Sequence, residues 1–445
     1  MALLKVVSVQ KPRQIAARIL KERLLDDKYT ENLLEIELAL HPLSPPDRGL
    51  LQELVYGIAR WQRTLDWLID RKTGARTQKA QLRILLQLGL YQMFWLDRVP
   101  NHAAVNETVE LARQLGFGPQ AGFVNAVLRG YGREQDQTRA LLAELKSKEP
   151  ALGHSHPDWL YQRWLARWGA EKAARLMEWN NRPPPTYARL NSLKTDTASL
   201  AARWNAEGVK FVPGQWDWVE EGQVFRLESH PPLAGLGSFQ EGFFYVQDPS
   251  TLLAERELAP QPGETVFDLC AAPGGKTTLM AQRMRNTGTI VAADFQPERL
   301  KLVRENCARL GVTNVVLQAA ANQKSQIKSP KLFDRILVDA PCSNTGVMRR
   351  RVDLRWRIRP EEVQRLRATQ LGLLGQAAAQ LKPGGALVYG TCSLEPEEND
   401  SVISEFLNAN PGLKLERQRE LLPFADEVDG AFVATMTSAC PGLAR

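Results

Sequence analysis

The second half of the chain repeats one pattern: a short apolar strand, a glycine-containing turn and a helix. The strands predicted from this pattern cover residues 265–269, 289–294, 315–318, 333–339 and 386–390. Parallel strands need long crossover connections, which helices usually supply, so this alternation predicts an α/β domain with a doubly wound, Rossmann-like sheet. Ligands of such sheets bind outside the carboxyl ends of the strands, and functional residues are therefore expected at that edge.

The first 135 residues have a helical pattern instead. Apolar residues recur three or four positions apart, for example at Leu82, Leu85 and Leu86, and proline-containing turns separate the segments. This part has 19 Lys and Arg against 14 Asp and Glu, a net charge of +5, in a chain whose net charge is +7. We predict a helical bundle with a basic side. The positive excess favours a polyanionic partner.

A mixed region lies between these two parts. The run Asn180-Asn181-Arg182-Pro183-Pro184-Pro185 cannot continue a helix and marks a boundary. Residues 186–246 then have the pattern of short strands around one helix, which predicts a small α+β subdomain. The side chains of Trp204, Trp216 and Trp218 could stack on bases, but core packing is the preferred interpretation.

We therefore expect three domains. The first is an all-helical domain over residues 1–140, and the second comprises linker helices and a small α+β, RNA-recognition-like subdomain over 141–246. The third is a Rossmann-like catalytic domain over 247–445.

Cysteine and histidine usage limits the kinds of site. Five cysteines, without a C-x-x-C pair, argue against a disulfide framework or a cysteine zinc site and favour a reducing, cytoplasmic setting. The five histidines form no metal-like cluster. The N-terminus has no secretory signal, and the most apolar stretch, residues 82–96, is too short to span a bilayer. We expect a cytoplasmic monomer that binds neither metal nor membrane.

The first candidate site follows strand 265–269, in Asp268-Leu269-Cys270-Ala271-Ala272-Pro273-Gly274-Gly275-Lys276-Thr277. Small residues let a ligand approach the backbone, and the following helix N-terminus supplies free N–H groups. A phosphate-binding P-loop would need glycine where the chain has Cys270, and the G-x-G-x-x-G dinucleotide motif is also absent. Asp294, at the end of the next strand, is placed to bind ribose hydroxyls. A nucleoside cofactor without a phosphate requirement is favoured, and S-adenosylmethionine is the common one.

Two cysteine motifs end two further strands at the same edge. They are Asp339-Ala340-Pro341-Cys342-Ser343-Asn344-Thr345-Gly346 and Tyr389-Gly390-Thr391-Cys392-Ser393. A single cysteine is more often a small buried hydrophobe, but two at one ligand-binding edge indicate thiol chemistry.

Such a pair suits methylation of carbon 5 of cytosine. A thiolate that adds to carbon 6 makes carbon 5 nucleophilic, and a base must then remove the carbon 5 proton before the thiol leaves. Lys276 is a candidate cation for forming the thiolate, and Asp339 can hydrogen-bond the ring and stabilise developing charge. Methylation of an exocyclic amine would suit Asn/Asp-Pro-Pro-aromatic, whereas this chain has Asp-Ala-Pro-Cys.

With these motifs, residues 247–445 closely resemble the RNA cytosine-5 methyltransferases of the Sun (Fmu) type. The pair Pro341-Cys342 and Thr391-Cys392 carries the resemblance. It implies Cys392 as the nucleophile that attacks carbon 6 and Cys342 as the thiol that assists product release. It also implies cofactor contacts from Cys270, Ala271, Ala272, Pro273, Gly274, Gly275, Lys276, Asp294 and Asp339. Three further runs resemble motifs of the family: residues 189–194, 247–250 and 429–432.

The N-terminal part resembles the RNA-binding fold of the antitermination factor NusB, through residues 99–112 and the run Gly122-Phe123-Val124-Asn125-Ala126-Val127-Leu128-Arg129. An ordinary helical bundle is the alternative. With this part, the resemblance covers nearly the whole chain and implies small-subunit (16S) ribosomal RNA as the substrate. Two other functions stay open: the same reaction on transfer RNA or another ribosomal site, and a non-catalytic RNA-binding or antitermination protein.

The chain departs from the family pattern at two places. Our alignment puts Ala320 where the family usually has an acidic residue that contacts the adenosine, and the family's His-Pro-Asp is here Arg351-Val352-Asp353. Residues 349–367 contain eight Arg and three acidic residues. Phosphate contacts are expected from Arg349, Arg350, Arg351, Arg355 and Arg357. Arg365 and Arg367 are expected on a salt-bridged helix face, and Cys307 and Cys440 in packing.

Overall fold

The computed structural model describes residues 11–25, 28–319 and 332–439. The chain divides into two compact units. Unit 1 comprises Met1–Arg182 and Met348–Arg357, and unit 2 comprises Pro183–Val347 and Ile358–Arg445. The chain therefore leaves unit 2 after Val347 and returns to it at Ile358.

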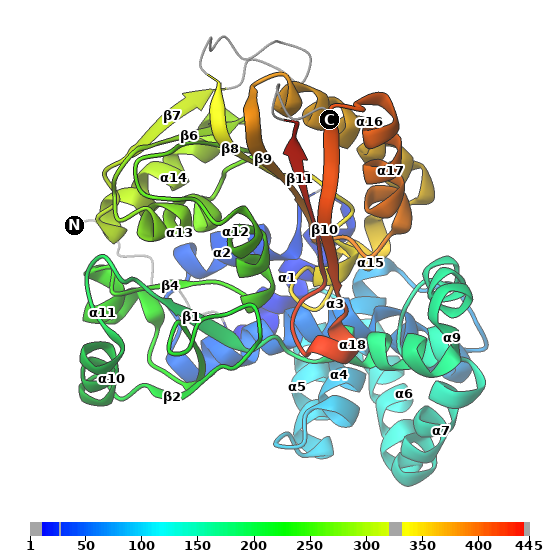
Figure 1. Ribbon diagram of the computed structural model, residues 1–445. Helices are drawn as coiled ribbons and strands as arrows, with labels where there is room; N and C mark the ends of the chain where they lie inside the picture. The colour runs from blue at the N-terminus through cyan, green and yellow to red at the C-terminus, as the bar shows by residue number, and fades with distance from the viewer. Residues whose placement is uncertain (1–10, 26–27, 320–331, 440–445) are drawn as a thin grey trace. The chain divides into compact units, whose positions relative to one another are not determined.

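Unit 1 is helical in the part of the chain that is described, as predicted for its first 135 residues (Figure 1). Its core is formed by the apolar faces of the first six α-helices, with fully buried residues such as Ile15, Leu51, Leu85 and Leu128. The helices are α1 (Pro12–Leu25), α2 (Thr30–Leu40), α3 (Pro45–Thr73), α4 (Ala80–Trp95), α5 (Asn101–Gln114), α6 (Ala121–Arg133), α7 (Gln135–Lys148), α8 (Pro150–Gly153), α9 (Asp158–Asn181) and α15 (Leu354–Arg357).

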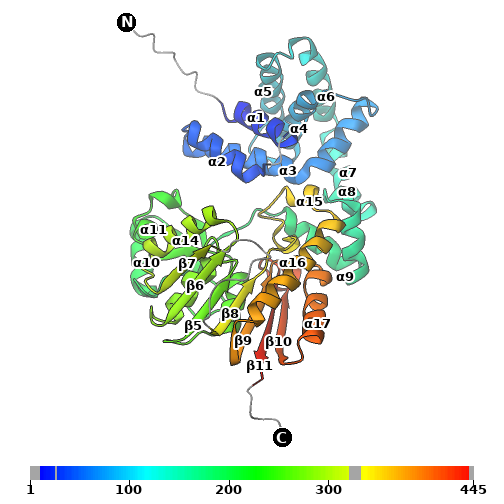
Figure 2. The same ribbon diagram turned by 90° about the horizontal axis from the view of Figure 1, so that it is seen from above.

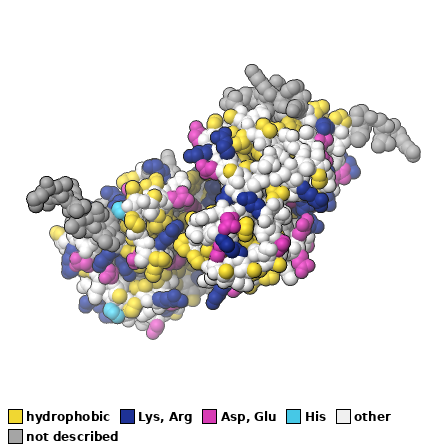
Figure 3. Space-filling model, turned by 90° about the vertical axis from the view of Figure 1, so that its left-hand side faces the viewer, with side chains coloured by type: hydrophobic (Ala, Val, Ile, Leu, Met, Phe, Trp, Pro, Cys, Tyr) yellow, Lys and Arg dark blue, Asp and Glu magenta, His cyan; other side chains and the backbone are white. Residues whose placement is uncertain are grey.

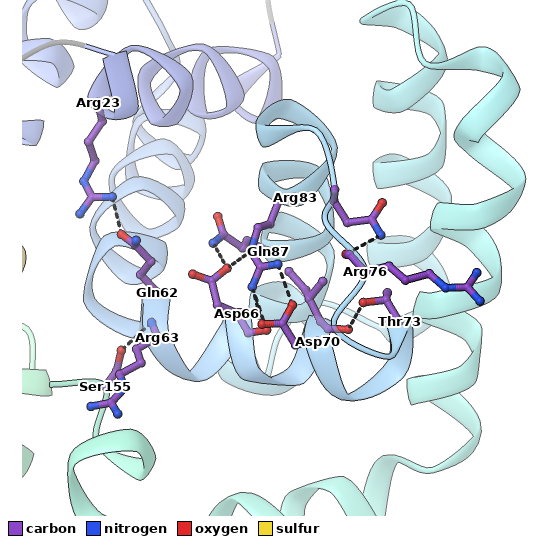
Figure 4. Close-up of polar contacts among 12 residues, drawn as sticks. Arg23, Gln62, Arg63, Asp66, Asp70, Thr73, Arg76, Arg83, Gln87 and Ser155 are labelled. Atoms are coloured by element: carbon purple, nitrogen blue, oxygen red, sulfur yellow. Dashed lines mark hydrogen bonds and ion pairs between the residues drawn. The ribbon is translucent and has the colours of Figure 1, made fainter. Parts of the chain in front are cut away.

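An ion-pair network joins α3 to α4 within this core. Arg83 of α4 pairs with Asp66 at 2.5 Å and with Asp70 at 2.8 Å, and Gln87 donates to Asp66 (Figure 4). Burial raises the pKa of Asp66, and the pairing with Arg83 opposes this rise. A cavity of about 230 Å³ in unit 1 is lined in part by Asp66, Arg83 and Gln87. Because these charged groups pair with one another, we interpret them as a network that stabilises the packing of α3 against α4.

Residues 348–357 contribute buried charges to unit 1, which corrects an expectation from the sequence. The Arg355 side chain is fully buried and donates to Asn181 Oδ1 at 2.7 Å and to the Asn180 carbonyl at 2.9 Å. Arg349 is only 2% exposed and lies over the Trp179 ring. The expectation of phosphate contacts from Arg355 and Arg349 is therefore wrong, because backbone and side-chain groups distant in sequence already enclose these guanidinium groups.

Unit 2 contains two sheets, of which the smaller has strand order β2-β3-β1-β4. Its elements are β1 (Thr186–Leu190), α10 (Thr197–Ala206), β2 (Lys210–Pro213), β3 (Val224–Ser229), α11 (Gly237–Gln240) and β4 (Phe244–Val246). Trp204 is fully buried against Phe225 and Phe244, and Trp218 is 4% exposed. Core packing of these two tryptophans is thus confirmed.

The larger sheet has strand order β10-β11-β9-β8-β5-β6-β7. Strands β5 to β9 are the five predicted from the sequence and pair in parallel. Strands β10 and β11 pair antiparallel and were not predicted from the sequence. The strands are β5 (Thr265–Leu269), β6 (Thr289–Asp294), β7 (Val315–Ala319), β8 (Phe333–Asp339), β9 (Leu381–Thr391), β10 (Leu413–Leu421) and β11 (Ala431–Ser438).

Helices cover both faces of this sheet, which makes it the doubly wound fold expected (Figures 1 and 2). Successive strand residues point to opposite faces, so Val266 packs in one apolar layer and Phe267 in the other. One layer includes helices α12 (Leu252–Leu258), α13 (Gly275–Arg283) and α14 (Pro297–Leu310), and the other includes α16 (Pro360–Ala378) and α17 (Asp400–Ala409). Short helices α18 (Pro423–Asp426), η4 (Thr345–Val347) and η5 (Pro396–Glu398) lie in the connections. Within the described residues, no helix combines the length and apolar character needed to cross a bilayer.

Candidate active site

The residues predicted from the sequence converge on the carboxyl edge of the parallel strands. Strand β5 leads into the loop that begins at Cys270, β6 ends at Asp294, β8 ends at Asp339, and β9 ends beside Cys392. The strand order β9-β8-β5-β6 makes these ends neighbours. The two cysteine motifs lie at adjacent strands, and the expected ribose-binding carboxylate lies two strands away from Asp339.

The loop from Cys270 to Lys276 is fixed from several sides. Cys270 has a positive φ of 69° and Gly274 one of 100°, the latter a conformation that glycine adopts without a Cβ clash. The backbone N–H of Ala272 donates to Asp294 Oδ2, and the Ala272 carbonyl accepts from Arg299 of α14. The loop is therefore held in one conformation between β5 and α13, with Asp294 forming part of its support.

Three carboxylates lie at neighbouring strand ends: Asp268, Asp294 and Asp339. Asp268 is fully buried and accepts a hydrogen bond from the Thr277 hydroxyl at 2.5 Å. Its Oδ1 has no hydrogen-bond partner among the described residues. Burial raises the pKa of Asp268 to about 7, and the Thr277 hydrogen bond opposes the rise. This concentration of acidic groups suits a ligand that carries positive charge, together with ribose hydroxyls.

Lys276 and Asp339 form an ion pair in the same place. Lys276 Nζ lies 2.6 Å from Asp339 Oδ2. Burial alone would lower the pKa of Lys276, but the attraction and hydrogen bond of Asp339 raise it, with a further contribution from Cys392. Lys276 is therefore a firmly protonated cation within electrostatic reach of the Cys392 sulfur.

The two cysteines are in direct contact. Their Sγ atoms are 3.3 Å apart, and both thiols are free. Cys342 is 7% exposed, whereas Cys392 is half-buried. The hydrogen bond with Cys392, followed by burial, raises the pKa of the Cys342 thiol well above its usual range. The arrangement places an accessible thiol beside a buried thiol that keeps its proton.

Asn344 contacts Cys392, the candidate nucleophile, and no role was predicted for it from the sequence. The Cys392 thiol donates to Asn344 Oδ1 at 3.0 Å, and Asn344 Nδ2 donates to the Cys342 carbonyl at 2.7 Å. Its φ of 58° is left-handed, a conformation that asparagine adopts more readily than most residues. The position of this asparagine two residues after Cys342, in the run Cys-Ser-Asn-Thr-Gly, is the sequence signal from which the contact could have been predicted.

The run 189–194 proves to be an internal attachment of the small sheet. Arg189 is fully buried and donates to the Gly275 carbonyl at 2.8 Å and to Thr278. Asn191 donates to the Leu310 carbonyl, and Lys194 to the Arg309 carbonyl, at the end of α14. Burial lowers the pKa of Arg189 to about 10. These side chains therefore connect β1 and the turn after it to α13 and to the end of α14, the two helices that follow the loop 270–276.

Other sequence expectations have simpler outcomes. Cys307 is buried in packing, as expected, whereas Cys440 and Ala320 lie outside the described residues. Arg365 pairs with Glu362 and Arg367 with Glu405, as expected for a salt-bridged helix face.

No group of three or more His, Cys, Asp or Glu suited to a metal occurs in the described part of the chain. On the face drawn in Figure 3, Lys and Arg side chains lie in several groups among acidic ones.

Comparison with known proteins gives three family-model matches. Residues 255–437 match the model described as 16S rRNA methyltransferase RsmB/F, and residues 10–133 match the NusB family. Residues 156–222 match the ferredoxin-like domain of RsmF/B-like methyltransferases. The fold expected from the two resemblances, including a NusB-like helical domain, is thereby confirmed.

Individual relatives agree with these models. The chain is 37% identical to the probable ribosomal RNA small subunit methyltransferase B of Synechocystis sp., over 96% of this chain and 99% of that protein. It is 36% identical to the ribosomal RNA small subunit methyltransferase B of Escherichia coli, over 95% and 98%. A solved methyltransferase homologue from Pyrococcus horikoshii is 33% identical, with a TM-score of 0.57, over 65% of this chain and 97% of that one.

Proposed function

Because the chain belongs to the family of ribosomal RNA small subunit methyltransferase B, we propose that it methylates carbon 5 of a cytosine in 16S ribosomal RNA through a Cys392–carbon 6 bond. The observation that carries the cytosine-5 assignment is the pair of thiols 3.3 Å apart at the ligand-binding edge of the sheet. Methylation of an exocyclic amine needs no covalent bond to the ring and gives no reason for two adjacent thiols.

The residues at the strand ends suit S-adenosylmethionine as the cofactor. This molecule supplies an electrophilic methyl group on a positively charged sulfur. We assign its binding to the loop 270–276 and to Asp294 and Asp339, with Asp294 on the ribose hydroxyls. The buried Asp268, whose Oδ1 lacks a partner among the described residues, adds an unpaired acceptor oxygen beside this loop.

Cys392 begins the reaction. Lys276 favours its thiolate, which donates an electron pair to carbon 6 and forms the sulfur–carbon bond. The electron pair of the carbon 5–carbon 6 double bond then forms the bond from carbon 5 to the methyl group, and the electron pair of the broken sulfur–methyl bond would remain on the cofactor's sulfur. Asp339 hydrogen-bonds the ring and stabilises the charge that develops there. The cytosine must be flipped out of any helix, because a stacked base does not expose carbon 6 to the thiolate.

Cys342 completes the reaction. The carbon 5 proton passes to the Cys342 sulfur as the Cys342 thiol proton passes to the departing Cys392 sulfur. The sulfur–carbon 6 bond breaks, its electron pair returns to Cys392, and the ring double bond re-forms. The raised pKa of Cys342 supports its entering this step as a thiol.

The test compares Cys342→Ala and Cys392→Ala, with Cys307→Ala as a control for loss of a buried thiol. Each protein is incubated with S-adenosylmethionine carrying a labelled methyl group and with small-subunit ribosomal RNA. We expect Cys342→Ala to accumulate a denaturation-resistant protein–RNA adduct at one cytosine. We expect Cys392→Ala to form neither adduct nor product, and Cys307→Ala to act like the wild type.

Two outcomes would contradict the proposal. Methyl transfer by Cys392→Ala at the wild-type rate would exclude Cys392 as the nucleophile. RNA binding without methyl transfer by the wild-type protein, on ribosomal and transfer RNA alike, would favour a non-catalytic RNA-binding protein. Product formed only on transfer RNA would keep the chemistry and replace the substrate.

A further inference from the structure

A buried carboxylate lies directly behind the two cysteine loops and has no part in the mechanism above. Glu398 is the last residue of η5, which follows the Cys392 loop, and its side chain is fully buried. A buried carboxylate is costly unless it is well hydrogen-bonded. The position of its partners therefore indicates what the group does.

Glu398 accepts hydrogen bonds from both loops. Oε1 accepts from the Ser343 backbone N–H at 2.8 Å, and Oε2 accepts from the hydroxyl groups of Ser343 and Ser393. Gln370 also donates to Oε1, at 3.0 Å, and to the Pro341 carbonyl. Ser343 directly follows Cys342 and Ser393 directly follows Cys392, so one carboxylate joins the residues next to both thiols.

The donors identify this as a positioning arrangement rather than a charge pair. All four hydrogen bonds described for the carboxylate come from uncharged groups. None of these donors is a cation that would offset the free-energy cost of burying the Glu398 charge. Burial raises its pKa, and the hydrogen bonds oppose the rise. An apolar residue could fill the space but could not hold two loops that are 50 residues apart in sequence.

We propose that Glu398 is a positioning residue that holds the Cys342 and Cys392 sulfur atoms in contact for the release step. The inference rests on the proposed function for its catalytic consequence, but the geometric part stands without it. Direct contacts between the loops, such as the Ser343–Ser393 hydroxyl contact at 3.0 Å, remain when the carboxylate is lost, but their shared acceptor is gone. The two sulfur atoms then spend less time within reach of each other. Release of the covalent intermediate slows as a result.

The first test measures how often the sulfur atoms meet, without RNA or cofactor. Diamide oxidises two neighbouring thiols to a disulfide and takes up their two electrons and two protons. The rate of the Cys342–Cys392 cross-link is followed by peptide mapping. We expect Glu398→Ala to slow it about tenfold or more, because three charge-assisted bonds to the loops are lost. Glu398→Gln keeps the shape and can bond the rotatable hydroxyl groups, so we expect it to stay within about threefold of the wild type.

Asp334→Ala is the matched control. Asp334 also joins separate strands, accepting from the Thr265 N–H at 2.8 Å and from Lys382, but it lies at the amino ends of β5 and β8, opposite the cysteine edge. We expect this variant to cross-link at the wild-type rate. Equal slowing in Asp334→Ala would indicate general loosening of the unit and would overturn the proposal, as would a wild-type rate in Glu398→Ala.

The second test uses the reaction. With ribosomal RNA and S-adenosylmethionine, Glu398→Ala should accumulate the covalent adduct although Cys342 is present, and Glu398→Gln should restore turnover. If Glu398→Ala does not fold, the Ser343→Ala, Ser393→Ala double variant removes the hydroxyl bonds and should give the same slowing. A wild-type protein without methyl transfer would refute the proposed function, whereas the cross-linking rates would still decide the role of Glu398.

Discussion

Replacing Asp268 by asparagine should stabilise the protein at pH 8 and reduce the pH dependence of its stability. Burial raises the pKa of Asp268 from its ordinary value of 3.8 to about 7. The folded protein therefore holds a proton that the unfolded chain has lost between these values. Since the folded state binds more protons, the free energy of unfolding falls as pH rises from 3.8 to about 7.

The size of the effect follows from this shift. At about 1.36 kcal/mol per pH unit, it corresponds to about 4 kcal/mol lost by pH 8. Asparagine carries no charge, but its amide nitrogen would meet the same lack of partners as one carboxylate oxygen, at a cost of about 1–3 kcal/mol. We expect a net gain of about 1–3 kcal/mol at pH 8 and none at pH 5.5.

The assay is urea unfolding at pH 5.5 and pH 8. Hydrogen exchange of peptides from β5 and β6 monitors the unfolding, so that unit 2 is observed separately. Asp334→Asn is the control with the opposite sign. Burial alone would raise the pKa of Asp334, but hydrogen bonds from Lys382 and Thr265 lower it to about 2. This stabilisation is complete above pH 3.8, so Asp334→Asn should destabilise unit 2 equally at both pH values. If Asp268→Asn is less stable than the wild type at pH 8, burial of the Asp268 charge costs less than the unpartnered amide of asparagine, and the reasoning is refuted.

Three other substitutions test separate parts of the structure. Arg23→Ala leaves the fully buried Asp353 without its ion-pair partner, and calorimetry should show unit 1 less stable by about 3–5 kcal/mol. A Cβ at Gly346 would lie 2.8 Å from the Cys392 carbonyl oxygen, so Gly346→Ala should lower kcat while titration calorimetry finds unchanged cofactor affinity. Arg189→Met removes the donor to the Gly275 carbonyl and should weaken S-adenosylmethionine binding about tenfold in the same calorimetric assay.

Local patterns predicted the elements and the position of the candidate site. The five parallel strands and the N-terminal helices have strong periodicity, and each site motif directly follows a predicted strand. Parallel strand ends meet at one edge whatever their order, so Lys276, Asp339, Cys342 and Cys392 could be assigned to one edge before their distances were known. Strands β10 and β11 were missed; much of β10 is exposed along its length, which gives it no clear apolar alternation.

The partners of buried polar groups could not be predicted. Residues 348–357 contain five arginines, a composition typical of a surface, yet Arg355 is enclosed by groups about 175 residues away in sequence. Glu398 likewise bonds Ser343, and nothing near either residue in sequence indicates the other.

The sequence by itself determined the fold class, the residues at the strand ends and the element types other than β10 and β11, because helix and strand periodicity and motif spacing are local properties. Only the tertiary structure decided that the two sulfur atoms touch, that Asn344 and Glu398 hold their loops, and that the arginine run supplies buried contacts in unit 1. These features depend on which distant groups satisfy a buried donor or acceptor, and that choice is made when the chain packs.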